Sequence, residues 1–287
     1  MQIIFLENNM HQKNANALYK YNNNYYVINS YDQLDKLDLN SFDCVYSPGI
    51  PLNVKKYPNT KFIFGPHFSV FPELHQMNEI RSNNVIYIQP SEWAAKVWET
   101  HSYCEKIKIK VLPFGVDTNK FCDTNHITNK NKVFIYFKYR SPEHLNLVTN
   151  FLNNKNIPYV IFSYKNRYNE QDYISYLQNS KFGIWLGGHE SQGFALQEAL
   201  SSNVPLLVWN VKSMNQEYGS TYDDIPATTI PYWDKRCGEY FYNFDEFENT
   251  FDAFLSKIET YKPREYILEN LSIKKCEEKL KELINNF

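Results

Sequence analysis

Residues 186–209 of this 287-residue chain read LGGHESQGFALQEALSSNVPLLVW. The apolar run 182–186 leads into this stretch, and the apolar run 204–209 closes it. The segment between them, 193–201, carries the residue spacing of a helix. Strand, helix and strand in this order predict a β-α-β unit, in which the two strands lie parallel in one sheet.

The loop of this unit is rich in glycine. Gly187, Gly188 and Gly193 are three of only nine glycines in the chain, and glycine allows a backbone to approach a ligand closely. The helix that begins here directs unpaired N–H groups and its positive dipole end out of the loop. A diphosphate fits such a place, and we expect Gly188, Gly193, Phe194 and Ala195 to be ligand-binding residues.

Two glutamates flank the helix start. Glu190 lies in the loop and Glu198 in the second helical turn, so one can face the head of a ligand and the other its flank. A helical wheel puts Leu196, Ala199 and Leu200 on the core stripe and Glu198 opposite them. A purely solvated role therefore stays open as the alternative for both glutamates.

The same alternation of apolar runs and helical stretches extends through the chain and predicts an α/β fold. The helix expected with the clearest signals is 91–101. Expected strands are 2–6, 25–28, 44–46, 61–64, 85–88, 107–112, 133–137, 159–162, 182–186 and 204–209, and further helices are 142–152, 170–178, 193–201, 244–258 and 272–284.

A polar stretch between 116 and 132 divides the pattern into two series. We therefore expect two Rossmann-like, doubly wound parallel-sheet domains that face a ligand-binding cleft. The expected bounds are 1–122 for the first domain, 123–132 for a linker and 133–260 for the second domain. Helices in 261–287 are expected to brace the pair.

Composition excludes several classes of protein. The net charge of −2 gives no basic field for nucleic acid, and no apolar run reaches the ~18 residues of a membrane span. The five cysteines form an odd set without a C-x-x-C pair, which argues against disulfides and zinc. We expect a soluble cytoplasmic protein with reduced thiols, and peripheral membrane association stays open.

The segment 189–200, together with 203–209, resembles the E-x7-E signature of glycosyltransferase family 4, whose members are retaining enzymes of the GT-B fold. Residues 111–117 with Phe121 resemble the family's P-x-G-V-D-x-x-x-F turn, and 88–93 resembles a strand-to-helix entry in its first domain. The resemblance implies that Glu190 contacts the donor sugar, Glu198 the ribose, and the amides of 193–195 the phosphates of a nucleotide sugar.

Further candidates follow other predicted strands. Lys138 and Arg140 end the strand 133–137, and their i, i+2 spacing is expected to direct both side chains to one face, where they would clamp a diphosphate. His67 follows the strand 61–64 and, by resemblance, lies near the donor sugar. Ser163 and Tyr164 are expected beside the nucleobase. Ordinary surface cations and a structural histidine are the alternatives.

The expected activity is retaining transfer of a sugar from a nucleotide sugar to a glycan or another hydroxyl acceptor. No D-x-D motif is present, so we expect no metal and no other cofactor. The family's glycine-rich loop is missing after the first strand, where 7–11 reads ENNMH, and the acceptor therefore stays unspecified. A nucleotide-sugar epimerase, a glycosyl phosphorylase and a noncatalytic donor-binding protein remain as alternatives.

Overall fold

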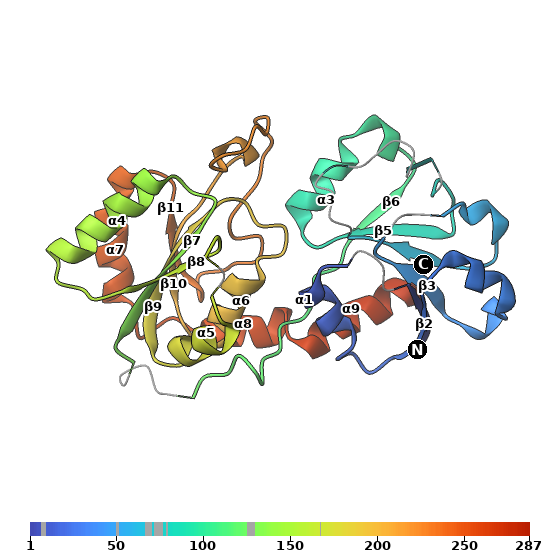
Figure 1. The fold of residues 1–287 in the computed structure, drawn as a ribbon, viewed down its shortest axis with the longest axis horizontal. Coiled ribbons are helices and arrows are strands. Elements are labelled where there is room, and N and C mark those ends of the chain that lie inside the picture. Colours follow the sequence, from blue (N-terminus) through green and yellow to red (C-terminus); the bar gives the residue numbers. More distant parts are fainter. Residues whose placement is uncertain are drawn as a thin grey trace. The chain divides into compact units, whose positions relative to one another are not determined.

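The computed structural model describes residues 1–6, 10–49, 52–66, 71, 77–78, 80–124, 130–166 and 168–287. Within them the chain forms two compact units, one of residues 1–115 with 273–287 and one of residues 116–272 (Figure 1). Each unit contains a parallel sheet, which confirms the predicted pair of α/β domains. None of the helices in the described ranges is long and apolar enough to cross a membrane.

The first unit is built on a sheet whose described strands are ordered β2-β1-β3-β4-β5-β6, with all neighbours parallel. Its main helices are α1 (Gln12–Leu18), α3 (Glu92–Glu99) and α9 (Ile273–Asn285). The strands are β1 (Gln2–Leu6), β2 (Asn24–Ile28), β3 (Cys44–Ser47), β4 (Phe62–Phe64), β5 (Val85–Gln89) and β6 (Lys108–Val111).

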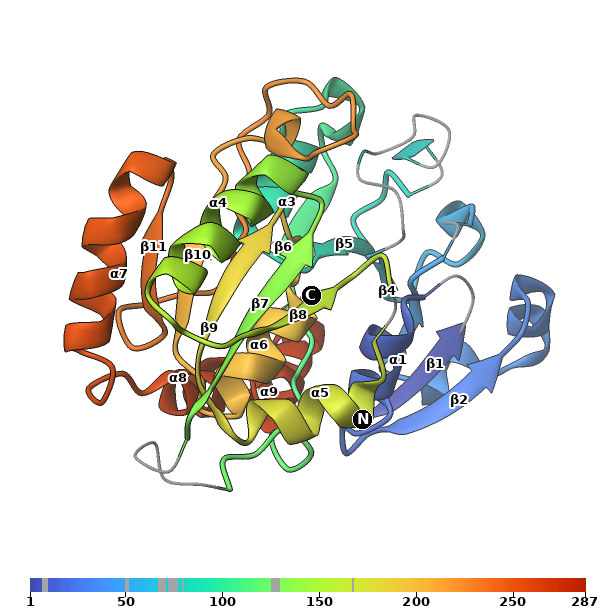
Figure 2. The ribbon, with the colours of Figure 1, turned by 60° about the vertical axis from the view of Figure 1, so that its left-hand side comes forward.

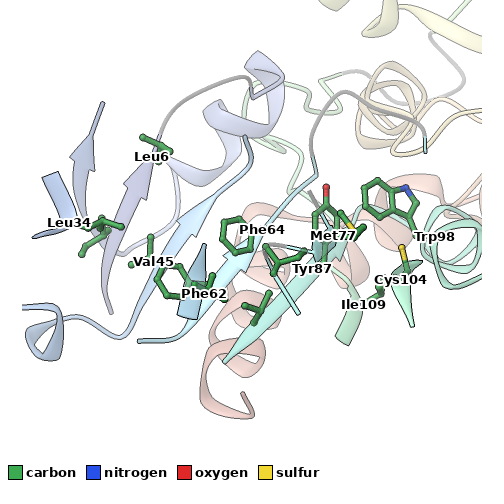
Figure 3. Packing of buried hydrophobic residues seen from close by; sticks show 14 of the residues in the cluster. Leu6, Leu34, Val45, Phe62, Phe64, Met77, Tyr87, Trp98, Cys104 and Ile109 are labelled. Carbon is green, nitrogen blue, oxygen red and sulfur yellow. The ribbon is translucent and has the colours of Figure 1, made fainter. Parts of the chain in front are cut away.

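Aromatic rings fill much of the core on one face of this sheet (Figure 3). Phe62 and Phe64 point to the same face because strand side chains alternate, and their rings stack with centroids 5.9 Å apart. Trp98, on the buried face of α3, stacks on Tyr87 of β5 at 4.4 Å. The apolar spacing that predicted the helix 91–101 therefore matches its packing against the sheet.

The second unit carries a parallel sheet in the order β11-β10-β9-β7-β8 among the described strands. Helices α4 and α7 cover one face, whereas α5 and α6 lie on the other (Figure 2). The elements are β7 (Lys132–Lys138), α4 (Pro142–Asn154), β8 (Val160–Ser163), α5 (Glu170–Leu177), β9 (Ser180–Gly187), α6 (Phe194–Ser201), β10 (Leu206–Trp209), β11 (Gly238–Phe241), α7 (Phe247–Ser256) and α8 (Pro263–Asn270).

The unit boundaries differ from the expected ones. The chain leaves the first unit after Gly115 and returns to it at Ile273, so α8 belongs to the second unit and α9 to the first. The stretch 116–124, expected as the end of the first domain and the start of a linker, belongs to the second unit. Hydrogen bonds hold this stretch together with the buried side chains of Val116 and Phe121: Val116 N donates to Leu271 O at 2.9 Å.

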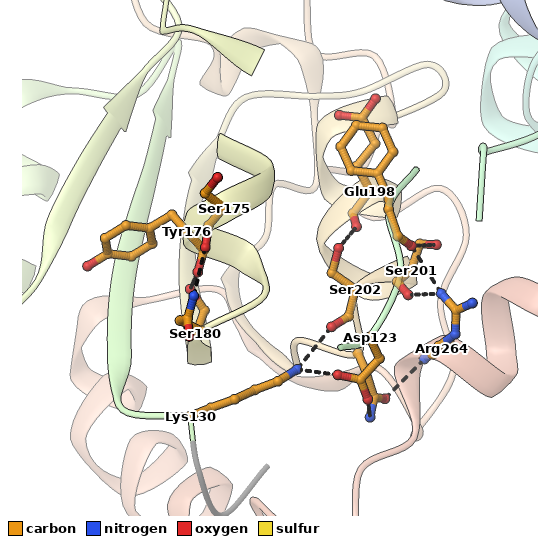
Figure 4. Close-up of polar contacts among 12 residues, drawn as sticks. Asp123, Lys130, Ser175, Tyr176, Ser180, Glu198, Ser201, Ser202 and Arg264 are labelled. Atoms are coloured by element: carbon orange, nitrogen blue, oxygen red, sulfur yellow. Dashed lines mark hydrogen bonds and ion pairs between the residues drawn. The ribbon is translucent and has the colours of Figure 1, made fainter. Parts of the chain in front are cut away.

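Arg264, on the first turn of α8, holds the same stretch (Figure 4). Its Nη1 donates to the carbonyls of Phe121 at 3.0 Å and Ser201 at 2.6 Å, and its Nη2 donates to the carbonyl of Thr118 at 3.1 Å. One planar guanidinium thus joins the stretch 116–124 to the end of α6.

We expect Arg264→Met to lower the free energy of unfolding of the chain by about 2–3 kcal/mol, because hydrogen bonds to a charged group contribute about 1.5–3 kcal/mol each and the three share one side chain. Urea unfolding followed by circular dichroism measures the loss. The matched control is Lys262→Met, whose exposed ion pair with Glu265 contributes little. Equal stability of the two variants would contradict a role for Arg264 in holding this stretch.

Candidate functional site

Charged side chains gather where β7 and β9 end in the second unit. Lys138 is the last residue of β7, and Glu190 follows β9 in the glycine-rich loop. Lys138 Nζ lies 2.8 Å from Glu190 Oε1 and 3.0 Å from Oε2, and the side chains are only 18% and 12% exposed. The solvated alternatives for Lys138 and Glu190 are therefore wrong. Burial works to lower the pKa of Lys138, but the Glu190 carboxylate, with smaller contributions from Tyr164 and Tyr139, raises it above its ordinary value.

Arg140 is more deeply buried, with 3% exposure. Its guanidinium carbon lies 5.1 Å from the ring centre of Trp209, at the end of β10. Burial lowers the pKa of Arg140 to about 10, which still leaves it charged at neutral pH. Its Nε is buried and has no hydrogen-bond partner among the described residues. A buried cation in this state is costly unless an anion compensates it.

Lys138 and Arg140 contact different groups, in contrast to the expectation from their i, i+2 spacing. The alternation of side chains applies within a strand, and β7 ends at Lys138. Tyr139, between them, has φ of +53°, a left-handed conformation uncommon for tyrosine. This turn of the backbone leaves Lys138 beside Glu190 and sends Arg140 to Trp209.

Helix α6 begins at the glycine-rich loop. Gly193 precedes it with φ of +75° and ψ of 44°, which favour glycine, and Gln197 Nε2 donates to the carbonyl of Gln192. Glu198 is only 4% exposed, so the solvated alternative from the helical wheel is wrong. The wheel placed Leu196, Ala199 and Leu200 in the core correctly, but α8 packs on α6 and covers further residues of it as well.

An aromatic pair lies beside Lys138. The rings of Tyr139 and Tyr164 lie 5.5 Å apart, and Lys138 Nζ is 4.7 Å from the centre of the Tyr164 ring. Tyr164 follows Ser163, the last residue of β8, and is 46% exposed. The Tyr164 ring therefore offers an accessible flat surface next to the buried ion pair.

A second pair lies one residue before Glu190. His189 Nδ1 is 3.2 Å from Glu217 Oε2, and the side chains are 10% and 15% exposed. Burial, with a contribution from the Lys138 charge, lowers the pKa of His189 to about 4. Burial also raises the pKa of Glu217; the Lys138 charge opposes this shift, and the Glu190 charge adds a smaller contribution in the same direction as burial. His189 is thus neutral at pH 7.

The depressed pKa of His189 predicts a loss of stability in acid. Its imidazole is neutral in the folded chain down to about pH 4, whereas an unfolded histidine takes up a proton near pH 6.5. The unfolded state binds more protons between these values, so stability is full above pH 6.5 and falls by about 3 kcal/mol towards pH 4.

This loss is measured by urea unfolding of the parent and of His189→Gln at both pH values. The parent should lose about 3 kcal/mol more than the variant over this range, and Glu217, whose pKa shifts the other way, is present in both proteins. An NMR titration of the His189 ring with a midpoint near 6.5 would contradict the prediction.

The structure brings together part of the expected site. Residues from the ends of β7, β8 and β9 meet around Lys138, namely Glu190, Tyr139 and Tyr164. His67 lies outside the described residues, as do the first residues of the segment 7–11. Sequence reasoning missed Glu217 and assigned no role to His189. Among the described residues, no group of three or more His, Cys, Asp or Glu side chains is arranged to hold a metal ion.

The fold is similar to solved glycosyltransferase structures. AviGT4, a glycosyltransferase involved in avilamycin A biosynthesis, matches with a TM-score of 0.58 and 10% identity over 99% of this chain and 97% of its own. The lipopolysaccharide outer core galactosyltransferase WaaB matches with a TM-score of 0.59 and 12% identity over 100% and 99%. Sucrose-phosphate synthase from Thermosynechococcus elongatus matches with a TM-score of 0.55 and 8% identity, over 100% of this chain and 98% of its own.

No protein-family model and no curated protein matches the sequence. At 8–12% identity the structural likeness concerns the fold. The chain therefore has the architecture of GT-B proteins, with two parallel-sheet α/β domains.

Proposed function

We propose that this chain is a retaining glycosyltransferase similar to family 4. It would move a sugar from a nucleoside diphosphate sugar to a hydroxyl group of a glycan or another acceptor, without a metal ion. The five cysteines, all within the described ranges, are free thiols, which suits a reducing compartment such as the cytoplasm.

The observation that carries the proposal is the pair of buried cations in the second unit. Lys138 is compensated by Glu190, but the Arg140 Nε has no hydrogen-bond partner within the described ranges. A bound diphosphate would supply the anion that this buried guanidinium lacks. The GT-B architecture supports the same interpretation, because the similar structures named above are sugar-transferring enzymes by title.

In the proposed reaction the bond between the sugar C1 and the diphosphate oxygen breaks, and a bond from C1 to the acceptor oxygen forms on the same face. The acceptor proton passes to the departing diphosphate. Negative charge grows on the diphosphate as it leaves. The transition state would therefore be bound more tightly than the ground-state donor by Lys138, Arg140 and the amides of 193–195. Glu190 would hold sugar hydroxyls and Glu198 the ribose.

Tyr164, with Ser163, would flank the nucleobase, since the Tyr164 ring is accessible and adjacent to Lys138.

Lys138 and Arg140 would take the part that a divalent metal plays in other enzymes, which is to stabilise the leaving group. Sugar transfer should therefore persist in excess chelator. Activity lost on chelation and restored by magnesium or manganese would contradict the metal-independent mechanism.

The first experiment is a thermal-shift screen of nucleotide sugars with the parent and Glu198→Gln. A donor at a hundred times its dissociation constant should add about 2.7 kcal/mol of stability to the parent. Glu198→Gln should bind the matching nucleoside diphosphate at least tenfold more weakly, since a carboxylate accepts ribose hydroxyl hydrogen bonds better than an amide. Unchanged affinity would contradict the role of Glu198.

Turnover then separates the enzyme from its alternatives. Transfer to an added acceptor supports the proposal, whereas phosphate-dependent cleavage would indicate a phosphorylase, and interconversion of donor sugars an epimerase. Tight donor binding without turnover on any acceptor would indicate a noncatalytic binding protein.

A further inference from the structure

The loop between β10 and β11 brings one more carboxyl group, which lies outside the E-x7-E segment, to the proposed donor site. Glu217 lies in this loop, directly after a short 3-10 turn, Met214–Gln216. Its Oε2 contacts His189 Nδ1 at 3.2 Å. It also lies 3.3 Å from the point that a Cβ on Gly188 would occupy. Glu217 therefore borders the loop that carries Glu190.

The backbone around Glu217 is fixed from both sides. Glu217 N donates to Met214 O at 3.1 Å, and Tyr218 N donates to the carbonyl of Tyr139 at 3.0 Å. The Ser213 side chain accepts a hydrogen bond from Asn215 N, and Gln216 Oε1 accepts one from Ser213 N at 3.2 Å, which forms a capping box. The Glu217 side chain is thus presented from an ordered turn.

A later part of the same loop, at Thr228 and Thr229, is hydrogen-bonded to its first residue, Asn210, and to the loop after β9. Asn210 Oδ1 accepts from Thr229 N at 2.8 Å and from Thr228 Oγ1 at 2.9 Å. The carbonyl of Thr228 accepts from Glu190 N at 2.9 Å. The loop that carries Glu217 and the loop that carries Glu190 are therefore joined by a direct hydrogen bond, which places them side by side.

Charge decides which part of a donor Glu217 can hold. Lys138 is already paired with Glu190 through both carboxylate oxygens. A further carboxylate repels a diphosphate, whereas sugar hydroxyls are neutral donors that a carboxylate accepts well. The neutral imidazole of His189 adds no positive charge that would reverse this preference.

We propose that Glu217 determines, together with Glu190, which sugar the donor site accepts, and that His189 is the positioning residue that orients the Glu217 carboxylate. The inference rests on the proposed transferase function. A site built to pair with a given hydroxyl rejects sugars that lack it or present it differently, because its own buried polar groups are then left unpaired. Glu217 thereby contributes to specificity for the sugar and not to affinity for the nucleotide.

The test compares binding of sugar and of nucleotide by calorimetry. The probes are UDP-glucose, UDP-galactose, UDP-N-acetylglucosamine and GDP-mannose, with UDP and GDP alone. The parent should bind one of the sugar donors more tightly than the others. Glu217→Gln should lower the affinity for that donor at least tenfold and change the affinity for the bare nucleotide by less than twofold. The control is Glu259→Gln, on an exposed residue of the same unit, which should match the parent.

His189→Gln distinguishes positioning from direct contact. This change should lower the affinity for the sugar donor several-fold, again without an effect on the affinity for the nucleotide. In the Glu217→Gln background it should cause no further loss of donor affinity, because the two residues act through one carboxylate. Additive losses would overturn the positioning role of His189.

Two results for Glu217→Gln overturn the specificity role: an unchanged affinity for the sugar donor, or an equal loss for donor and nucleotide. Glu217→Asp provides a second variant, which should show the same selective loss if the Gln variant does not fold. A parent that binds neither the sugar donors nor the bare nucleotides overturns the proposed transferase function instead, and the inference with it.

Discussion

Replacing Arg140 by methionine should lower the single-turnover rate of sugar transfer about a hundredfold to a thousandfold, the usual effect of removing one preorganised group that stabilises transition-state charge. The same change should leave the free energy of unfolding unchanged or raise it. Arg140 is 3% exposed and rests on the ring of Trp209. An apolar side chain in that place removes the desolvation penalty of a buried charge.

The transfer rate should fall while the free energy of unfolding stays unchanged or rises, and this combination makes the experiment decisive. A structural arginine would stabilise the fold and its loss would destabilise it, whereas a cation kept for a bound anion costs stability in the empty protein. Single-turnover rate, donor affinity and urea unfolding are measured for Arg140→Met beside Lys235→Met, an exposed cation of the same unit. A variant with a parental rate and lowered stability would contradict the proposed role.

Replacing Lys138 by methionine should reduce both stability and rate. Glu190 would then be left 12% exposed and without the cation that contacts both of its oxygens. Removing one partner of a buried ion pair typically costs about 3 kcal/mol or more. The rate of transfer should fall about a hundredfold or more, because the charge on the leaving diphosphate loses a partner.

The double variant Lys138→Met with Glu190→Gln separates the two effects. Stability should recover most of its loss, since no uncompensated charge remains, while the transfer rate should stay low. The matched control is Lys257→Met, which breaks an exposed pair with Glu239 at 3.1 Å and should cost less than about 1 kcal/mol. A double variant that transfers sugar at the parental rate would exclude both residues from the reaction.

The ion pair between Lys138 and Glu190 also fixes the positions of both side chains. In the proposed reaction, Lys138 would share its donors between Glu190 and a phosphate oxygen of the donor. Tyr139, in its left-handed conformation, is the residue at which the backbone turns between the two cations. Strained positions of this kind are concentrated at functional sites.

Local patterns in the sequence predicted most of the strands and helices. The β-α-β unit around 186–209 forms as expected, since apolar runs, the left-handed Gly193 and the core stripe of α6 act over a few neighbouring residues. The strand β11 was missed because its sequence, GEYF, contains a glycine and a glutamate and therefore forms no apolar run. The helix α8 was given no range of its own because its apolar spacing is weak.

The alternating α/β order, the glycine-rich loop and the two glutamates can be predicted from the chain alone, because each depends on residues close together in sequence. The contacts of Lys138 with Glu190, of Arg140 with Trp209 and of Glu217 with His189 appear only once the chain is folded. Such contacts join residues far apart in sequence, and no local pattern encodes them. They arise when parallel strands bring their carboxyl ends to one edge of a sheet.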